Sequence, residues 1–263
     1  MDPILDPVTA TPPAEVSLNN APLVRVIAQV RFPMVAAIGQ QKFIAPFQEA
    51  IRKKYPVLRP EHTQNIILNP GAPEVKTQTV WRFLDVSANW RVSLAPDFLA
   101  LETSKYTNRT DFIDRLNHVV SAAKEHVEPS LVDRLGVRYI NRISGEEVND
   151  IASLVRSELT GVLTTPLGGH VEHVLSETMI RVDNNQVMAR WGCVPPKVTV
   201  DPTAIEPVDD RSWILDVDMF TATPFAFEVE RISNDALSFA SRVYTFFRWA
   251  VTEEFLRRHG GNP

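Results

Sequence analysis

The 263-residue chain is 44% hydrophobic and 22% charged, a composition typical of globular proteins that excludes overall disorder. Its net charge of -5 argues against a protein whose main task is to bind phosphate backbones, because such proteins usually contain a basic domain. The single cysteine, Cys193, excludes an intrachain disulfide, and no stretch approaches the 18 or so apolar residues of a membrane span. We therefore expect a cytoplasmic protein that does not bind membranes.

The first part of the chain mixes one helix with several strands. Residues 1–22 form a proline-rich arm that we expect to be flexible, because prolines among small and polar residues favour neither helix nor strand. Alternating apolar and polar residues over 23–32 predict a half-buried strand, and helical spacing of apolar residues predicts a helix over 43–55. Alternation then returns in three short runs that predict an antiparallel meander. These runs are 80–86, 90–94 and 98–103.

The rest of the chain, up to the C-terminus, also alternates between predicted helices and predicted strands. Asn108 can cap a helix that extends to residue 127, since Asp111 follows in its first turn. The turn residues Asp183-Asn184-Asn185 predict a hairpin, and several prolines predict a loop over 195–210. Further strands are predicted over 135–143, 171–182, 186–194 and 212–220, and further helices over 148–163 and 234–259.

These elements predict an α+β fold, with an antiparallel sheet and helices packed on one face. Residues 23–145 and 146–263 each combine helices with hairpin strands, so we interpret them as two similar β-rich halves, most simply within one structural unit. The opposite face of the sheet would then be free for a ligand or partner.

Asp216 and Asp218 are the weak candidates for catalysis. They lie two residues apart in a predicted strand, so both side chains point to one face, about 7 Å apart. Two carboxylates at that spacing can bind a hard cation or divide acid and base roles. The alternative is that they belong to an ordinary polar face.

Arginines recur on the predicted strands. Arg138 and Arg142 share a face of one strand, while Arg25 and Arg31 lie on the polar face of another. If these faces align, they form a basic surface that could bind single-stranded nucleic acid or an acidic protein. Surface salt bridges are the alternative interpretation.

Metal and cofactor motifs are weak or absent in the sequence. His170 and His173 are the weak candidates for a metal site, but in a strand their side chains would point to opposite faces, so no metal is expected. Cys193 has no neighbouring base in the sequence and is interpreted as a small buried residue. Phosphate-loop, dinucleotide and nucleophile-elbow motifs are missing, so no cofactor is expected.

Several segments together resemble a sporadically distributed family of uncharacterised bacterial proteins. The most specific is Arg134-Leu-Gly-Val-Arg-Tyr-Ile-Asn-Arg142. Others are the strand that opens at Ala21, the run Phe98-Leu-Ala-Leu-Glu-Thr103, the run Leu215-Asp-Val-Asp218 and the run Ala250-Val-Thr-Glu-Glu-Phe255. The resemblance covers nearly the whole chain after the arm but implies no activity. By analogy with accessory genes, its patchy distribution suggests phage defence or toxin control.

The missing catalytic motifs and the arginine-rich strands lead us to expect a noncatalytic binding or adaptor module with a protein partner. Two alternatives stay open: a metal-assisted enzyme that acts on phosphodiesters or nucleotides through Asp216 and Asp218, and a nucleic-acid-binding sheet. The sequence also leaves open whether the chain forms a homo-oligomer.

Overall fold

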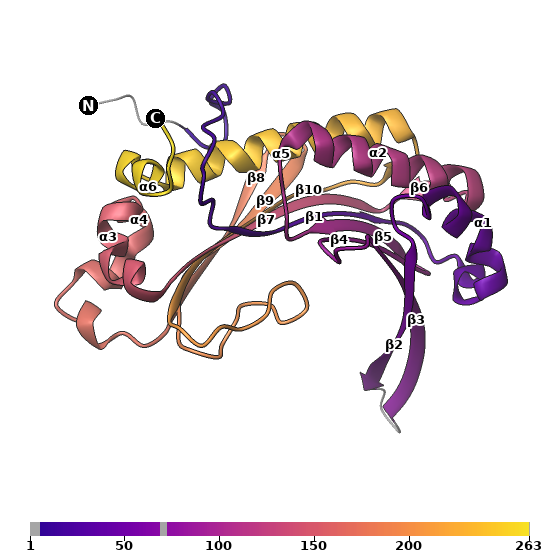
Figure 1. The fold of residues 1–263 in the computed structure, drawn as a ribbon, viewed down its shortest axis with the longest axis horizontal. Helices are drawn as coiled ribbons and strands as arrows, with labels where there is room; N and C mark the ends of the chain where they lie inside the picture. The colour runs from indigo at the N-terminus through magenta and orange to yellow at the C-terminus, as the bar shows by residue number, and fades with distance from the viewer. Residues whose placement is uncertain (1–5, 69–72, 263) are drawn as a thin grey trace. The chain divides into compact units, whose positions relative to one another are not determined.

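The computed structural model describes residues 6–68 and 73–262 (Figure 1). In this part of the chain, six α-helices accompany a nine-stranded antiparallel sheet and a two-stranded sheet, which confirms the predicted α+β class. The strand order is β2-β3-β4-β5-β1-β7-β10-β9-β8 in the large sheet and β11-β6 in the small one. None of the helices described is both long and apolar enough to cross a membrane.

The chain divides into two compact units, each assembled from separate segments. Unit 1 comprises residues 1–26, 137–220 and 238–263, and unit 2 comprises residues 27–136 and 221–237. The similarity between residues 23–145 and 146–263 stays a prediction.

Unit 2 contains the predicted meander. Strands β3 (Pro73–Leu84), β4 (Trp90–Ala95) and β5 (Phe98–Thr103) pair antiparallel in chain order, as expected from their alternation. Helix α2 (Arg109–His126) begins where predicted, because the Asn108 side chain accepts a hydrogen bond of 2.8 Å from the Asp111 N–H. Unit 2 also contains η1 (Ala36–Gly39), α1 (Gln41–Ile51), β6 (Leu131–Val132) and β11 (Phe225–Ala226).

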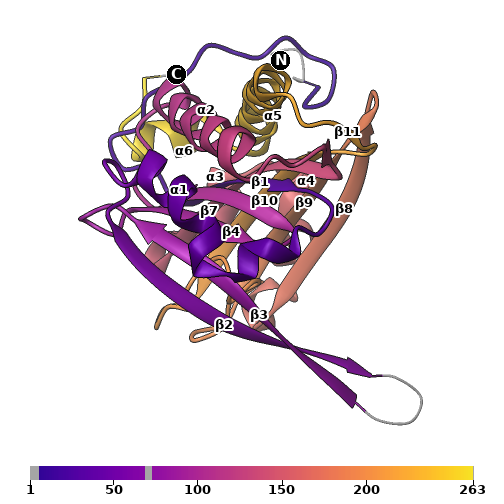
Figure 2. The ribbon, with the colours of Figure 1, turned by 90° about the vertical axis from the view of Figure 1, so that its right-hand side faces the viewer.

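The long hairpin in Figure 2 contains a strand that the sequence analysis did not assign. Strand β2 (Val57–Leu68) pairs along its length with β3. Pro60 lies inside β2, and a proline argues against a central strand because it cannot donate to the ladder. The proline is tolerated because β2 is an edge strand.

Unit 1 carries most of the strands that surround the candidate site. These are β1 (Leu23–Arg31) up to Val26, β7 (Arg134–Ser144) from Val137, β8 (Val174–Val182), β9 (Asn185–Val194) and β10 (Ser212–Thr221) up to Phe220. The part of helix α5 (Val229–Ala250) in this unit covers one face of these strands, and the loop 195–211 lies on the other face (Figure 1). On β10, Trp213, Leu215 and Val217 are buried toward the helix, and Asp216 points toward the loop.

The prediction of one helix over residues 148–163 is wrong. The structure has four short segments instead, namely η2 (Gly145–Asp150), α3 (Ile151–Leu154), α4 (Ser157–Thr160) and η3 (Gly161–Thr164). Val155 is extended and forms a β-bridge with Val251, and the Arg156 N–H donates to the Ala250 carbonyl. Tertiary hydrogen bonds thus replace helical ones at this point.

The C-terminal helix predicted over 234–259 is also interrupted. It consists of α5 and of α6 (Glu253–Arg258), separated at Val251 and Thr252. The Thr252 hydroxyl accepts a hydrogen bond from the Phe255 N–H and so caps α6, while it also lies 2.7 Å from the Ser153 carbonyl. The Val155–Val251 bridge and the Thr252–Ser153 hydrogen bond therefore connect the two places at which the predicted helices are interrupted.

Residues 6–22 of the N-terminal arm follow the C-terminal helices. The Val16 N–H donates to the Tyr244 hydroxyl over 2.8 Å, and Arg242 donates to the Ala10 carbonyl over 2.8 Å. His259 lies 2.8 Å from the Asn20 carbonyl. The structure therefore gives the arm a defined path along α5 and α6.

Candidate functional site

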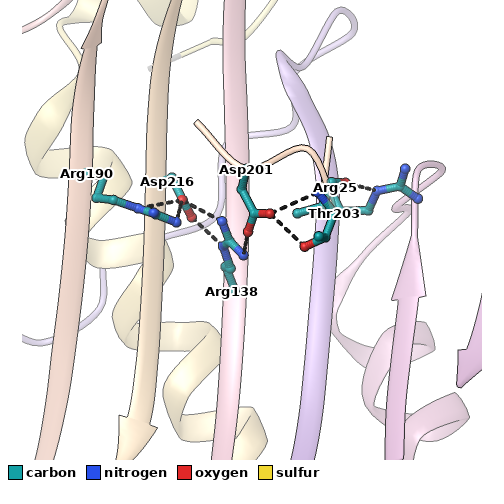
Figure 3. A network of polar contacts seen from close by, with 7 residues as sticks. Arg25, Arg138, Arg190, Asp201, Thr203 and Asp216 are labelled. Carbon is teal, nitrogen blue, oxygen red and sulfur yellow. Dashed lines mark hydrogen bonds and ion pairs between the residues drawn. The ribbon is translucent and has the colours of Figure 1, made fainter. Parts of the chain in front are cut away.

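Three strands of unit 1 place charged side chains on one face of the sheet. Arg138 lies on β7, Asp216 on β10 and Arg190 on β9, and these strands are neighbours in that order. Figure 3 shows both guanidinium groups directed at the carboxylate between them. We call Arg138, Arg190, Asp201 and Asp216 the arginine–aspartate network.

Asp216 accepts hydrogen bonds from both arginines. Arg138 binds it in a bidentate manner, with 2.7 Å from Nε to Oδ1 and 2.8 Å from Nη2 to Oδ2. Arg190 donates to Oδ2 from Nε and Nη2 over 3.1 and 2.6 Å. The Asp216 side chain is only 1% exposed. Its carboxylate is therefore occupied by guanidinium groups and is not available to a substrate or cation without breaking these ion pairs.

The network continues into the loop 195–211. Arg138 Nη1 lies 2.8 Å from Asp201 Oδ2, and Asp201 Oδ1 accepts hydrogen bonds from the Thr203 N–H and hydroxyl over 3.0 and 2.6 Å (Figure 3). A carboxylate that binds its own backbone two residues on is a local turn motif. Arg138 thus connects the strands to a preformed turn of the loop.

Two more arginines bind main-chain carbonyls of the same loop. Arg25 Nε donates to the Ala204 carbonyl over 3.1 Å, and Arg142 Nη2 donates to the Glu206 carbonyl over 2.6 Å. Burial lowers the pKa of both guanidinium groups, which reflects the cost of removing them from water. Together with Arg138, they bind the loop at positions 201, 204 and 206.

The charges of the network stabilise one another. Burial acts to raise the pKa of Asp201, but hydrogen bonds from Thr203 and Arg138 outweigh it and lower the pKa to about 2. For Arg138, burial acts to lower the pKa, and the carboxylates of Asp216 and Asp201 raise it above its ordinary value instead. Both groups therefore stay charged at neutral pH.

We predict a pH-dependent contribution from Asp201. Its pKa is about 2 in the folded protein against an ordinary value of 3.8, so its interactions stabilise the fold above about pH 4 and are lost as the pH falls toward 2. The stability difference between the wild type and Asp201→Asn should therefore shrink between about pH 6 and pH 3, as measured by urea unfolding. Asp209→Asn controls for the loss of one charge from this loop. A difference that stays constant with pH would contradict the prediction.

The four arginines that the sequence suggested as a basic surface each have a partner within the chain. Arg25, Arg138 and Arg142 all bind the loop in unit 1. Arg31 belongs to unit 2, where it pairs with Asp97 over 2.8 Å. Each of the four is thus engaged within the chain.

The other predicted site residues are Asp218, His170 and His173. Asp218 is buried two residues beyond Asp216 on β10. His170 lies in η4 (Gly168–His170) and His173 lies just before β8, and both are exposed. Across residues 6–68 and 73–262, no group of three or more His, Cys, Asp or Glu residues could hold a metal ion. Cys193 is fully buried, as predicted, and burial raises the pKa of its thiol.

Arg190, Asp201 and Thr203 were not identified from the sequence as site residues. The segment Asp201-Pro202-Thr203 does carry a local signal, because aspartate followed two residues later by a donor is typical of a turn. Nothing local indicates that Arg138, 63 residues earlier in the chain, binds this turn.

No protein-family model and no curated protein matches the chain. The resemblance to a sporadically distributed bacterial family therefore stays a prediction.

Proposed function

We propose that this chain is a noncatalytic binding module that recognises a protein through the loop 195–211. The observation that carries this proposal is that three arginines bind the loop at three separate positions, 201, 204 and 206. The partner itself is inferred from the chemistry of the exposed loop residues.

The loop is anchored from within as well as from the strands. Ala204 and Ile205 are buried, and the Lys197 N–H donates to the Val208 carbonyl over 2.7 Å across the base of the loop. A loop held in one conformation loses little entropy when it binds a partner, so more of the contact energy appears as affinity. Anchoring of this kind suits a recognition loop.

The exposed charges of the loop favour a protein over a nucleic acid. Three exposed acidic residues, Glu206, Asp209 and Asp210, accompany a single exposed lysine, Lys197. This excess of negative charge repels phosphates. The neighbouring arginines are already bound to loop atoms. Val198, which is also exposed, offers an apolar contact.

The metal-assisted enzyme is less well supported by the geometry. Its main candidate, Asp216, is occupied by Arg138 and Arg190, and a cation at that position would have to displace both guanidinium groups. The cytoplasmic location rests on the single cysteine, and the role in phage defence or toxin control rests on the family resemblance alone.

Affinity purification tests the proposal. We expect the tagged chain to recover a stoichiometric protein from its native host, identified by mass spectrometry, and Val198→Asp to reduce that recovery at least about tenfold by burying a charge in the interface. Met34→Asp is the matched control, since Met34 is an exposed apolar residue of unit 2. Full recovery by Val198→Asp, or recovery of nucleic acid alone, would refute the proposal.

A further inference from the structure

Strand β8 ends the nine-stranded sheet. Its nine residues, Val174–Val182, pair with β9 on one side, and in the described part of the chain no strand follows on the other side (Figure 2). In an antiparallel pair, alternate residues direct their N–H and C=O groups away from the neighbour, so β8 presents unpaired main-chain groups along its outer edge.

This edge has only part of the usual protection against strand pairing, namely the charges of Glu177 and Arg181. Natural edge strands are often short or carry lysine or proline, whereas β8 is long and contains neither. Two of its apolar side chains are well exposed, Leu175 at 41% and Met179 at 55%. The edge therefore has the character of a surface that another strand covers.

The charges of β8 alternate with these apolar residues on one face. Leu175, Glu177, Met179 and Arg181 occur at every second position and are all exposed. Glu177 and Arg181 lie symmetrically about Met179, two residues to either side. A strand with this pattern is complementary to a second copy of itself in the antiparallel direction.

We propose that two copies of this chain associate through antiparallel pairing of β8, with Met179 on the twofold axis. Met179 then lies opposite Met179 of the second copy, and Glu177 lies opposite Arg181 of the second copy at two symmetric positions. Directly opposed side chains in an antiparallel pair share a face and lie about 5 Å apart, which suits both an apolar contact and an ion pair.

Charge selects this register from the neighbouring ones. An axis through Glu177 would place two glutamates opposite each other, and an axis through Arg181 would place two arginines opposite each other, and both arrangements are repulsive. An axis through Thr178 or Ile180 would place charged residues opposite apolar ones. The pairing uses no residue of the loop 195–211, so the dimer does not depend on the proposed function, although Glu177 also lies opposite Arg190 of β9 within the chain.

Sedimentation equilibrium over a concentration series tests the dimer. We expect the wild type to rise from the monomer mass of 29.6 kDa toward twice that mass as concentration increases. Glu177→Arg and Arg181→Glu alone should each weaken association at least about tenfold, because each places like charges opposite one another twice. An equimolar mixture of the two single variants restores opposite charges at both positions and should associate as a heterodimer. This mixture also shows that both variants are folded.

Cysteine crosslinking tests the register. Met179→Cys should form an intermolecular disulfide under mild oxidation, because the two Cα atoms lie opposite each other within the range that a disulfide spans. Leu175→Cys is the control, since residue 175 lies opposite residue 183 of the second copy and far from its own counterpart; Cys193 is buried. A wild type that stays monomeric, association that ignores the charge changes, or equal crosslinking of both variants would overturn the proposal.

Discussion

Replacing Asp216 by asparagine should lower the free energy of unfolding by about 3 kcal/mol, measured by urea denaturation. The substitution keeps the shape of the side chain but removes the carboxylate that neutralises Arg190 and leaves Arg138 paired with Asp201 alone. Breaking a buried ion pair in this way costs roughly 3–5 kcal/mol. We expect the lower end of this energy range because the side chains of Arg138 and Arg190 remain 15% and 18% exposed.

Two further variants separate charge from packing at this position. Asp210→Asn, at an exposed position in the loop, should change stability by less than about 0.5 kcal/mol. The triple replacement Asp216→Leu, Arg138→Met and Arg190→Met should be more stable than Asp216→Asn, because it removes the Asp216 carboxylate and both of its arginine partners together and leaves only the partly exposed Asp201 without its arginine. An Asp216→Asn protein as stable as the wild type would show that the network contributes little.

Replacing Gly192 by alanine should lower the free energy of unfolding by about 3 kcal/mol, since a strained backbone conformation alone costs about 1–3 kcal/mol. Gly192 has a φ of +148°, which residues with a side chain rarely adopt. A Cβ atom there would lie 2.0 Å from the Val174 carbonyl oxygen. Because that oxygen belongs to the backbone of β8, the strand itself would have to move.

Urea unfolding measures this loss. Hydrogen exchange locates it, since we expect Gly192→Ala to speed exchange of the β8 amides relative to the wild type more than it speeds exchange in the meander of unit 2. Gly169→Ala is the matched control because no atom lies within 4 Å of a Cβ at that position. Its stability should stay within about 0.5 kcal/mol of the wild type. Equal stability of Gly192→Ala and Gly169→Ala would contradict the prediction.

Local patterns in the sequence were enough to predict most strands and helix α2, although β3 begins at Pro73 and not at the predicted residue 80, and β2 was missed. The meander and the hairpin of β8 and β9 follow from alternation and turn residues, and α2 follows from its apolar spacing and its Asn108 cap. These features depend on residues close together in the chain. They are therefore visible without knowledge of the fold.

Contacts between distant residues decided the rest. Val155 and Val251 form the bridge that divides two predicted helices, although each lies within a pattern that favours helix. Asp216 was predicted as a weak catalytic candidate, yet its binding to Arg138 and Arg190 depends on three strands that become neighbours only in the folded sheet. Sequence periodicity identifies the face on which a side chain lies, but only the tertiary structure determines which charges meet on that face.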